Sequence, residues 1–356
     1  MYVPTTSHVS PLATIRRERL LPQPGYVLVG EDERVEPTTV VAKTETVSRH
    51  FFYDLTVRLD VKAEEAQKFL RVQQGIAVEK SEVIAVRPTM LGFSSKRVRA
   101  PLKGTVVEIK DGKVLFAATG PEYEMKAGLP GIVSSVNAEW GVMLETTGAL
   151  IQGAWGSGKQ EYGVLKMLVN DPTQPLAAEL LDESCKGAIV VAGTADEKAV
   201  RLAVKVKVRG LILGSMSASS IRMTRTLPFP ILVVEGFVNR ILTSHAWTLL
   251  ADHNGREVFL DARPPDRWAG RRPEVIIPLP PPGGMPPLPA DGQPLDEGKR
   301  VRILRAPYTG AIGTVLFIPA RMQTMPSGVQ TYVAHVELEG GQGEVVVPVA
   351  NLEIFE

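Results

Sequence analysis

A proline-rich stretch near the carboxyl end limits most strongly how this chain can fold. Residues 263–297 contain eleven of the 28 prolines. Because proline fixes φ and has no N–H to donate, such a stretch is barred from regular structure. We expect an extended polyproline-II spacer between folded modules. Such stretches can also be ligands for proline-reading domains, and of the two interpretations the plain linker is favoured.

Chain length and charge limit the number of modules and the kind of partner. With 356 residues the chain is too long for one ordinary hydrophobic core, so we expect about two to four domains. A hydrophobic content of 44% and a charged content of 22% are typical of folded protein rather than of disorder. The 40 Lys and Arg residues nearly balance the 39 Asp and Glu residues. The whole-chain charge therefore does not indicate a strongly basic nucleic-acid binder.

The cysteine content and the hydropathy pattern indicate where the protein resides. Cys185 is the only cysteine, so neither an intrachain disulfide nor a cysteine-cluster metal site can form. The first twenty residues contain no apolar run that resembles the core of a signal peptide. No stretch approaches the roughly 18 to 20 apolar residues that a membrane span needs. We predict a cytoplasmic protein without membrane contact, and its oligomeric state stays open.

Short β-type runs dominate the first half of the chain. We interpret residues 1–20 as a flexible arm and residues 21–172 as a β-rich region. Within this region, residues 25–42 and 69–85 echo each other, because each reads as a short strand, a polar turn and a closing strand. Between them, Val61 to Leu70 is rich in Ala, Glu and Lys and is the best short helix of the region.

Two parts of this region carry a resemblance to a known fold. Residues 75–85 and 99–106 (RAPLKGTV) resemble the two half-motifs of the barrel-sandwich hybrid fold of biotinyl and lipoyl carrier domains and of membrane-fusion adaptors. The resemblance implies that fold for roughly residues 20–150. Carrier domains present a modified lysine in the hairpin between the halves, where this chain has residues 87–95 and no lysine before Lys96. We therefore predict a structural relative without the prosthetic group, and no cofactor.

From about Leu176 the pattern changes to alternating strands and helices. Strands are expected at residues 187–192, 210–214 and 230–234, with a helix from Asp196 to Lys207 after the first. This alternation predicts an α/β unit over residues 173–262 with an at least partly parallel sheet.

The residues around the second of these strands resemble a family fingerprint. Residues 214–230 align without a gap to the swivelling phosphohistidine domain of phosphoenolpyruvate-utilising enzymes. Gly214, Arg225 and Pro230 coincide with it, but Ser219 occupies the histidine position. Serine cannot accept a phosphoryl group from phosphoenolpyruvate as imidazole does, so the resemblance implies a fold and not an activity. A generic small α/β domain is the alternative.

The segment after the proline-rich stretch reads as a small barrel. Residues 298–356 fit a five-stranded SH3-like barrel, and their spacing resembles the KOW motif of transcription elongation and ribosomal proteins. Gly310 and Gly313 stand at glycine positions of that motif, where glycine permits sharp turns. The fold class we predict is a multi-domain chain, mainly β with one α/β module: a barrel-sandwich-like amino-terminal part, a swivel-like middle and an SH3-like barrel.

A glycine-rich segment has the spacing of a phosphate-binding loop. Gly153 to Lys159 read GAWGSGK, but Gln160 stands where the motif requires Ser or Thr to ligate magnesium. Residues 161–169 look like a strand, so no helix N-terminus would face a phosphate. We interpret the segment as a hairpin turn, with a divergent nucleotide site at 153–159 as the alternative.

The remaining chemistry-bearing residues give no catalytic or metal site. The five histidines are scattered, and no pair has i, i+4 spacing, so we predict no metal. His245 lies in a Thr-Ser-His-Ala tetrapeptide like that of the swivelling domain, but after the third strand, and is expected to start an ordinary helix. Cys185 has one basic neighbour, Lys186, and is expected to be a structural thiol rather than a nucleophile.

Basic and glycine positions supply the candidate interaction residues. Lys96, Arg97, Arg99 and Lys103 form the densest basic cluster, and strand alternation would place Arg97 and Arg99 on one face. This cluster fits phosphate or an acidic partner, whereas a solvated edge strand is the commoner explanation. On the terminal barrel the candidates are Arg302, Arg305, Tyr308, Gly310 and Gly313.

Three functions remain open at this point. The favoured hypothesis is a non-enzymatic scaffold that docks protein partners through small β modules, because the barrel from Asp296 carries five basic and seven acidic residues. A net-negative barrel is poorly suited to phosphate neutralisation. The second hypothesis is a transcription- or translation-associated factor that contacts RNA polymerase, ribosome or RNA through the KOW-like barrel. The third is an enzyme that acts at the 153–158 loop or near His245.

Overall fold

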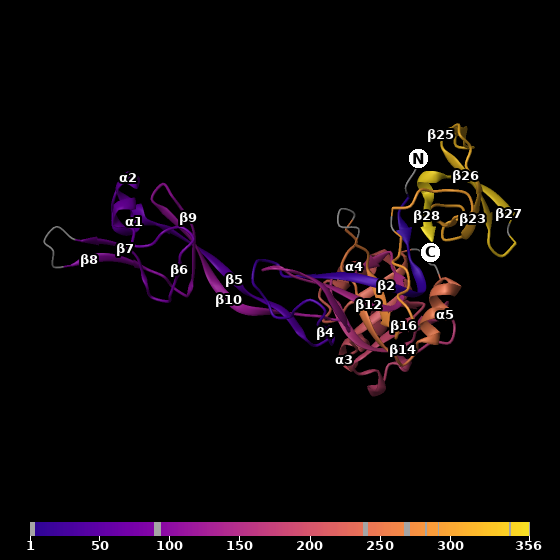
Figure 1. The fold of residues 1–356 in the computed structure, drawn as a ribbon, viewed down its shortest axis with the longest axis horizontal. Coiled ribbons are helices and arrows are strands. Elements are labelled where there is room, and N and C mark those ends of the chain that lie inside the picture. Colours follow the sequence, from indigo (N-terminus) through magenta and orange to yellow (C-terminus); the bar gives the residue numbers. More distant parts are fainter. Residues whose placement is uncertain are drawn as a thin grey trace.

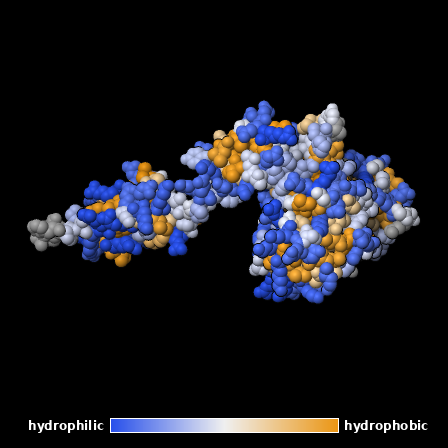
Figure 2. All heavy atoms as spheres, turned by 90° about the horizontal axis from the view of Figure 1, so that it is seen from below, coloured by the Kyte–Doolittle hydropathy of each residue, from blue (hydrophilic) through white to orange (hydrophobic). Residues whose placement is uncertain are grey.

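The computed structural model describes residues 4–88, 94–237, 241–266, 271–281, 283–290, 292–341 and 343–355. This part of the chain is mainly β and contains several separate sheets. A small lobe lies at one end of the long axis and a larger body at the other (Figure 1). A narrow neck joins them (Figure 2). Among the described helices, none has the length and apolar character that a membrane crossing requires.

The small lobe, here called the distal module (residues 51–118), is held by a long two-stranded ribbon. Its sheet has the order β3 (Tyr26–Val27), β5 (Val40–Asp54), β10 (Lys113–Lys126), β9 (Gly104–Lys110) and β6 (Ala77–Val78). The antiparallel strands β5 and β10 pair along almost their whole length and form the neck. Branched and aromatic residues favour the extended conformation in both strands.

The distal module has its own hydrophobic core. Leu55, Leu59, Ile84 and Phe116 are fully buried in it. Around this core lie β7 (Val83–Pro88), β8 (Ser95–Arg99), α1 (Leu55–Leu59), α2 (Ala63–Ala66) and the 3-10 turn η1 (Gln67–Phe69). The Asp54 carboxylate caps α1 by accepting hydrogen bonds from the first backbone N–H groups of the helix.

The body is built on one eleven-stranded sheet. This sheet and the helices that cover it are here called the central unit. Its order is β13 (Trp155–Gly156), β19 (Ile231–Gly236), β18 (Gly210–Ser215), β16 (Ala188–Ala192), β14 (Gln160–Met167), β20 (Glu257–Asp261), β21 (Glu274–Pro278), β12 (Gly141–Gln152), β11 (Gly131–Asn137) and β4 (Arg34–Val35), and β2 (Val9–Leu20) also pairs with β12. Strands β14, β16, β18 and β19 are parallel to one another. This agrees with the partly parallel sheet expected from the alternating pattern.

Helices cover both faces of the parallel part of the sheet. Helix α3 (Glu197–Val206) begins where the Asp196 carboxylate accepts from Ala199 N at 2.7 Å, and it packs Val200 and Ala203 against one face. Helix α5 (Ser244–Asp252) packs Ala246 and Leu250 against the other. The smaller elements are β15 (Pro175–Leu176) paired with β17 (Thr194–Ala195), the 3-10 turns η2 (Ala178–Leu180), η3 (Glu183–Cys185) and η4 (Ala218–Ser220), and α4 (Ile221–Thr224).

The carboxyl-terminal module (residues 295–355) closes the chain with a six-stranded sheet. Its order is β1 (Thr6–Ser7), β28 (Leu352–Phe355), β22 (Arg300–Ile303), β23 (Ile312–Phe317), β26 (Val333–Leu338) and β27 (Gly343–Pro348), with a small hairpin of β24 (Gln323–Thr324) and β25 (Gln330–Thr331) and the 3-10 turn η5 (Val349–Asn351). The amino-terminal strand β1 is parallel to β28, so the first described residues belong to the last module. The module encloses a core that includes Val301, Ala334 and Ile354.

Two expected flexible segments are ordered parts of the sheets. Residues 9–20, expected as an arm, form β2, in which Ala13 and Ile15 are buried. Residues 274–278, expected as part of a linker, form β21 between β20 and β12, with three fully buried branched residues at its centre. The prolines that follow β21 run beside β2, because Thr14 N donates to Pro287 O at 3.1 Å. Burial of the apolar residues 275–277 stabilises a strand there, although prolines lie on both sides of it. The centre of the hairpin expected at 87–95, residues 89–93, lies outside the described residues.

Candidate interaction surfaces

Strand β8 presents three of the predicted basic residues at the end of the distal module. Lys96, Arg97 and Arg99 are exposed, whereas Val98 between them is only 4% exposed and points into the core. Arg97 Nε donates to Ser95 Oγ at 2.9 Å, and Arg99 Nη1 donates to the Ser81 carbonyl at 2.8 Å. These contacts hold the guanidinium groups on the outward side of the strand.

Lys103, the fourth residue of the cluster, lies elsewhere. It follows β8 and pairs with Glu45 of β5 at 3.2 Å, on the neck rather than at the end of the module. The hydrogen bond to Glu45 raises the pKa of the Lys103 ammonium. Lys96 instead lies 3.7 Å from Asp60, which follows helix α1. The structure therefore brings Lys96, Arg97 and Arg99 together and separates Lys103 from them.

Charge is distributed unevenly along the molecule. Residues 51–118 contain 12 Lys and Arg residues and 8 Asp and Glu residues, a net charge of +4. Because the whole chain has a net charge of +1, the rest of the chain carries −3. Residues 83–107 hold five basic residues and no acidic residue. The distal module is thus a basic lobe on an acidic body, although the whole-chain balance conceals this.

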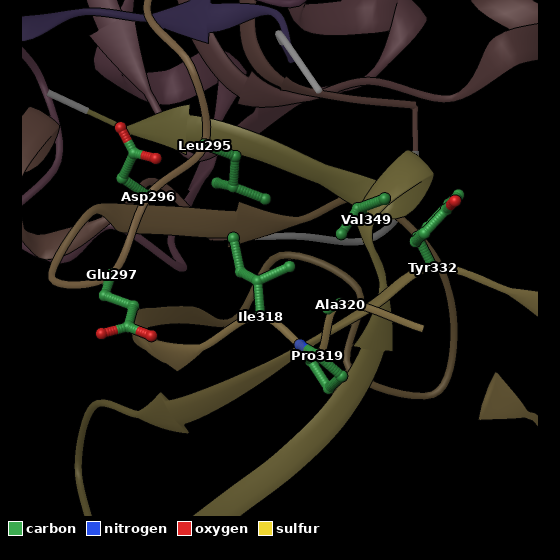
Figure 3. Close-up of a pocket in the computed structure, with 8 residues that line it drawn as sticks. All are labelled: Leu295, Asp296, Glu297, Ile318, Pro319, Ala320, Tyr332 and Val349. Atoms are coloured by element: carbon green, nitrogen blue, oxygen red, sulfur yellow. The ribbon is translucent and has the colours of Figure 1, made fainter. Parts of the chain in front are cut away.

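The carboxyl-terminal module carries an apolar groove with an acidic side. The cavity, of about 910 Å³, is lined by Leu295, Ile318, Pro319 and Val349, with Tyr332 at one side and Asp296 and Glu297 at the other (Figure 3). Tyr332 is 48% exposed, and both carboxylates are exposed. Sequence reasoning missed this groove, because its walls come from segments that are about fifty residues apart along the chain.

Arg302, a predicted interaction residue, is buried between modules. Its Nη1 donates to Glu235 Oε2 of β19 at 3.0 Å, its Nε donates to Glu353 Oε2 of β28 at 3.0 Å, and its Nη2 donates to Ser7 Oγ at 3.3 Å. Arg272, beside β21, pairs with the second oxygen of Glu353 at 2.5 Å. This cluster joins the central unit, the amino-terminal strand and the carboxyl-terminal module. The side chain of Arg302 is therefore occupied within the chain.

At Glu353 and Arg302, the neighbouring opposite charges outweigh the effect of burial on the pKa. Burial alone raises the pKa of Glu353, but the guanidinium charges of Arg302 and Arg272 outweigh it and hold the pKa below its ordinary value. Burial lowers the pKa of Arg302, and the carboxylates of Glu353 and Glu235 more than reverse this. Removing one partner from such a buried, hydrogen-bonded set of charges is costly, because the remaining charge is left uncompensated.

The other predicted residues of this module serve different purposes. Arg305 is exposed and Tyr308 is 40% exposed. Gly310 has φ of 86°, a conformation that favours glycine. A Cβ on Gly313 would come within 2.5 Å of the Glu337 carbonyl oxygen in the neighbouring strand. The two glycines thus shape a turn and a strand contact, and only Arg305 and Tyr308 remain available to a partner.

The glycine-rich 153–159 segment is a tight packing element. It contains β13, and β14 follows it directly, so no helix begins there. A Cβ on Gly156 would lie 2.1 Å from the Ala262 carbonyl oxygen. The Lys159 ammonium donates to the carbonyl oxygen of Leu227. The segment is nevertheless not the hairpin turn expected from the sequence, because β13 pairs with β19 whereas β14 pairs with β16 and β20. It is a connection between separate places in the sheet, and its contacts are not those of a loop around a phosphate.

The carboxyl ends of the parallel strands border a cavity of about 770 Å³. Thr194, Ser215, Ser217 and Ser220 supply hydroxyl groups to its wall. Ser219, at the histidine position of the swivelling fingerprint, is hydrogen-bonded to Ser217 Oγ at 2.7 Å. Crevices at this edge of α/β sheets commonly receive ligands, but the described contacts of Ser219 bring no base to it.

His245 takes part in the junction between modules. It lies in the first turn of α5, and Arg300 Nη2 of β22 approaches its Nε2 at 3.0 Å. Its ring also meets the edge of the Phe355 ring, with centroids 6.4 Å apart. A structural contact therefore explains this histidine. Within the described ranges, no group of three His, Cys, Asp or Glu side chains could hold a metal ion.

An arginine-rich cavity of about 470 Å³ is a further feature that the sequence did not reveal. Its five arginines each lie near a carboxylate, in the pairs Arg16–Glu145, Arg17–Glu274, Arg263–Asp261, Arg271–Asp266 and Arg272–Glu353. In three of these pairs, Arg16–Glu145, Arg17–Glu274 and Arg272–Glu353, the partners are far apart along the chain, so no local pattern signals them. These three pairs link β2 to β12, β2 to β21, and the start of the β21 segment to β28.

Comparisons with known proteins do not assign this chain to a family. The chain matches no protein-family model, and a search of the curated proteins finds no similar one.

Proposed function

We propose that the protein is a non-enzymatic cytoplasmic scaffold that docks protein partners through its two end modules. In this proposal the distal module is part of the barrel-sandwich-like region expected over residues 21–172, without a carrier lysine. Residues 173–262 of the central unit are swivel-like, and the carboxyl-terminal module is a KOW-type, SH3-like barrel. The observation that carries the proposal is the placement of two exposed surfaces of different chemistry at the two ends of the long axis (Figure 1).

The internal construction supports such a role. The distal module and the carboxyl-terminal module have separate cores, so each can present its surface without rearrangement of the other. The Arg302 cluster fixes the carboxyl-terminal module to the central unit. The paired strands β5 and β10 hold the distal module away from the body. A rigid spacing between two docking surfaces raises the effective concentration of one partner near the other.

One observation favours a second candidate, a factor that contacts RNA. Residues 83–107 combine five basic residues with no acidic ones, and such a stretch suits phosphate neutralisation. In this version the RNA contact lies on the distal module rather than on the carboxyl-terminal module, whose charge is net negative.

An affinity capture from native lysate tests the proposal. Wild type is compared with the triple variant Lys96→Glu, Arg97→Glu, Arg99→Glu, and with a control that makes the same charge change on the central unit: Lys186→Glu, Lys198→Glu, Lys205→Glu. Half of each sample is treated with nuclease. The scaffold proposal expects a defined set of proteins that survives nuclease, is retained by the control and is lost from the triple variant. Proteins that vanish with nuclease favour the RNA candidate, and equal capture by all three forms rejects both.

A further inference from the structure

The two end surfaces differ in charge in a way that makes them complementary. At the distal end, the tip surface consists of Lys96, Arg97 and Arg99 of β8, all three exposed. The tip surface offers three cations, of which Lys96 lies 3.7 Å from the Asp60 carboxylate.

The groove of the carboxyl-terminal module offers the matching chemistry. Its floor is apolar, and its carboxylates, Asp296 and Glu297, lie together at one side (Figure 3). One exposed cation, Arg321, follows the lining residue Ala320 and reduces the negative charge there. A volume of about 910 Å³ lies near the upper end of the range of roughly 300–1,000 Å³ that is usual for ligand sites, so it has room for several side chains.

The two surfaces cannot meet within one molecule. The distal module and the carboxyl-terminal module, which carry the tip surface and the groove, lie toward opposite ends of the long axis (Figure 1). The neck and the Arg302 cluster fix these modules. In a second copy, the cationic tip surface can reach the acidic groove of the first copy. The groove of the second copy is likewise open to the tip surface of another. We infer that the tip surface of one copy docks in the carboxyl-terminal groove of another.

This contact joins different surfaces of identical chains. Such a head-to-tail contact repeats from copy to copy, and it closes into a ring or continues as an open filament. The inference rests on the proposed function, because it names a second copy of the chain as the partner of both end surfaces.

The first test follows the solution mass of the purified full chain. Analytical ultracentrifugation over a wide concentration range should show mass that increases with concentration at about 0.1 M ionic strength and falls toward the monomer at about 1 M, because the screening length shortens from about 10 Å to about 3 Å. A monomer at every concentration at low salt overturns the inference.

A charge exchange between the two surfaces gives the decisive test. The tip variant is Lys96→Glu, Arg97→Glu, Arg99→Glu, and the groove variant is Asp296→Lys, Glu297→Lys. Each variant alone sets like charges against each other, so the dissociation constant of self-association should rise at least about tenfold. In an equimolar mixture each tip surface again faces a groove of opposite charge, and assembly should return. Arg321→Ser in the wild type should tighten assembly. All substituted side chains are exposed, and circular dichroism checks that the fold is kept.

The outcomes separate this inference from the proposed function. If the variants associate as strongly as wild type, or if the mixture stays monomeric, the head-to-tail contact is wrong. Loss of this contact with retained, nuclease-resistant capture of other proteins overturns the inference and leaves the scaffold proposal standing. Binding of single-stranded RNA by the tip surface of a chain that stays monomeric overturns it in favour of the RNA candidate.

Discussion

Arg302 of β22 and Glu235 of β19 meet across two modules, with Nη1 and Oε2 3.0 Å apart and both side chains almost completely buried. The residues are 67 positions apart along the chain and belong to different sheets. In the register of the carboxyl-terminal sheet, Arg302 also stands directly opposite Glu353. One guanidinium therefore bonds to carboxylates of both the central unit and the carboxyl-terminal module.

The first prediction concerns removal of that guanidinium. Arg302→Ala leaves the carboxylates of Glu235 and Glu353 buried with a partner missing, and we expect a loss of about 3–5 kcal/mol in the free energy of unfolding. Urea denaturation followed by tryptophan fluorescence measures it. Arg305→Ala, three residues away and exposed, is the matched control and should change the free energy by less than about 0.5 kcal/mol. Equal effects of the two substitutions would show that the cluster does not hold the modules together.

The second prediction is a pH dependence that comes from Glu353. Its pKa is depressed in the folded protein relative to the ordinary value of 4.5. Its stabilising contribution is therefore complete above about pH 4.5 and is lost as the pH falls below that value toward the folded pKa. Glu353→Gln removes this titration, so the difference in unfolding free energy between wild type and variant should shrink on acidification. A difference that stays constant from pH 7 to pH 3 would contradict the assignment.

The third prediction concerns the glycine-rich segment 153–159. Gly156→Ala places a Cβ against the Ala262 backbone, and since backbone atoms cannot move aside easily, we expect a loss of about 3 kcal/mol in stability. Gly30→Ala is the control, because nothing lies within 4 Å of the Cβ there and no positive φ is required. Thermal unfolding should separate the two variants clearly. If Gly156→Ala is as mild as the control, the close approach does not exist.

The fourth prediction addresses the nucleotide interpretation of the same segment. Because the Lys159 ammonium is engaged by the Leu227 carbonyl, we expect no binding of ATP at millimolar concentration in calorimetry. Saturable binding of ATP that Lys159→Ala abolishes would restore the enzyme hypothesis.

Local patterns predicted the individual elements of the α/β region well. The alternation of apolar runs and an Asp-capped helical stretch anticipated β16, α3, β18 and β19, because each of these elements carries its own burial pattern within a few residues. The strand after the 153–158 segment was anticipated for the same reason and appears as β14. The mainly β character of the chain followed from its short, turn-bounded runs.

Prediction failed for elements whose partners are far away along the chain. Residues 9–20 look polar because few side chains of β2 are buried. The strand that pairs with β2, β12, is more than a hundred residues away along the chain. The apolar residues at 275–277 were hidden among prolines, although they complete the central sheet. The burial of Arg302 depends on Glu235 and Glu353, which no local pattern connects with it.

The measurement that tests the scaffold proposal most directly is lysine-directed cross-linking mass spectrometry on the assembly isolated from native lysate. Lys62, Lys68 and Lys96 report on the distal module, Lys299 reports on the carboxyl-terminal module, and Lys186, Lys198 and Lys205 report on the central unit. If the end modules dock partners, cross-links to partner chains concentrate on the first four lysines. Cross-links that concentrate on the three lysines of the central unit would contradict it.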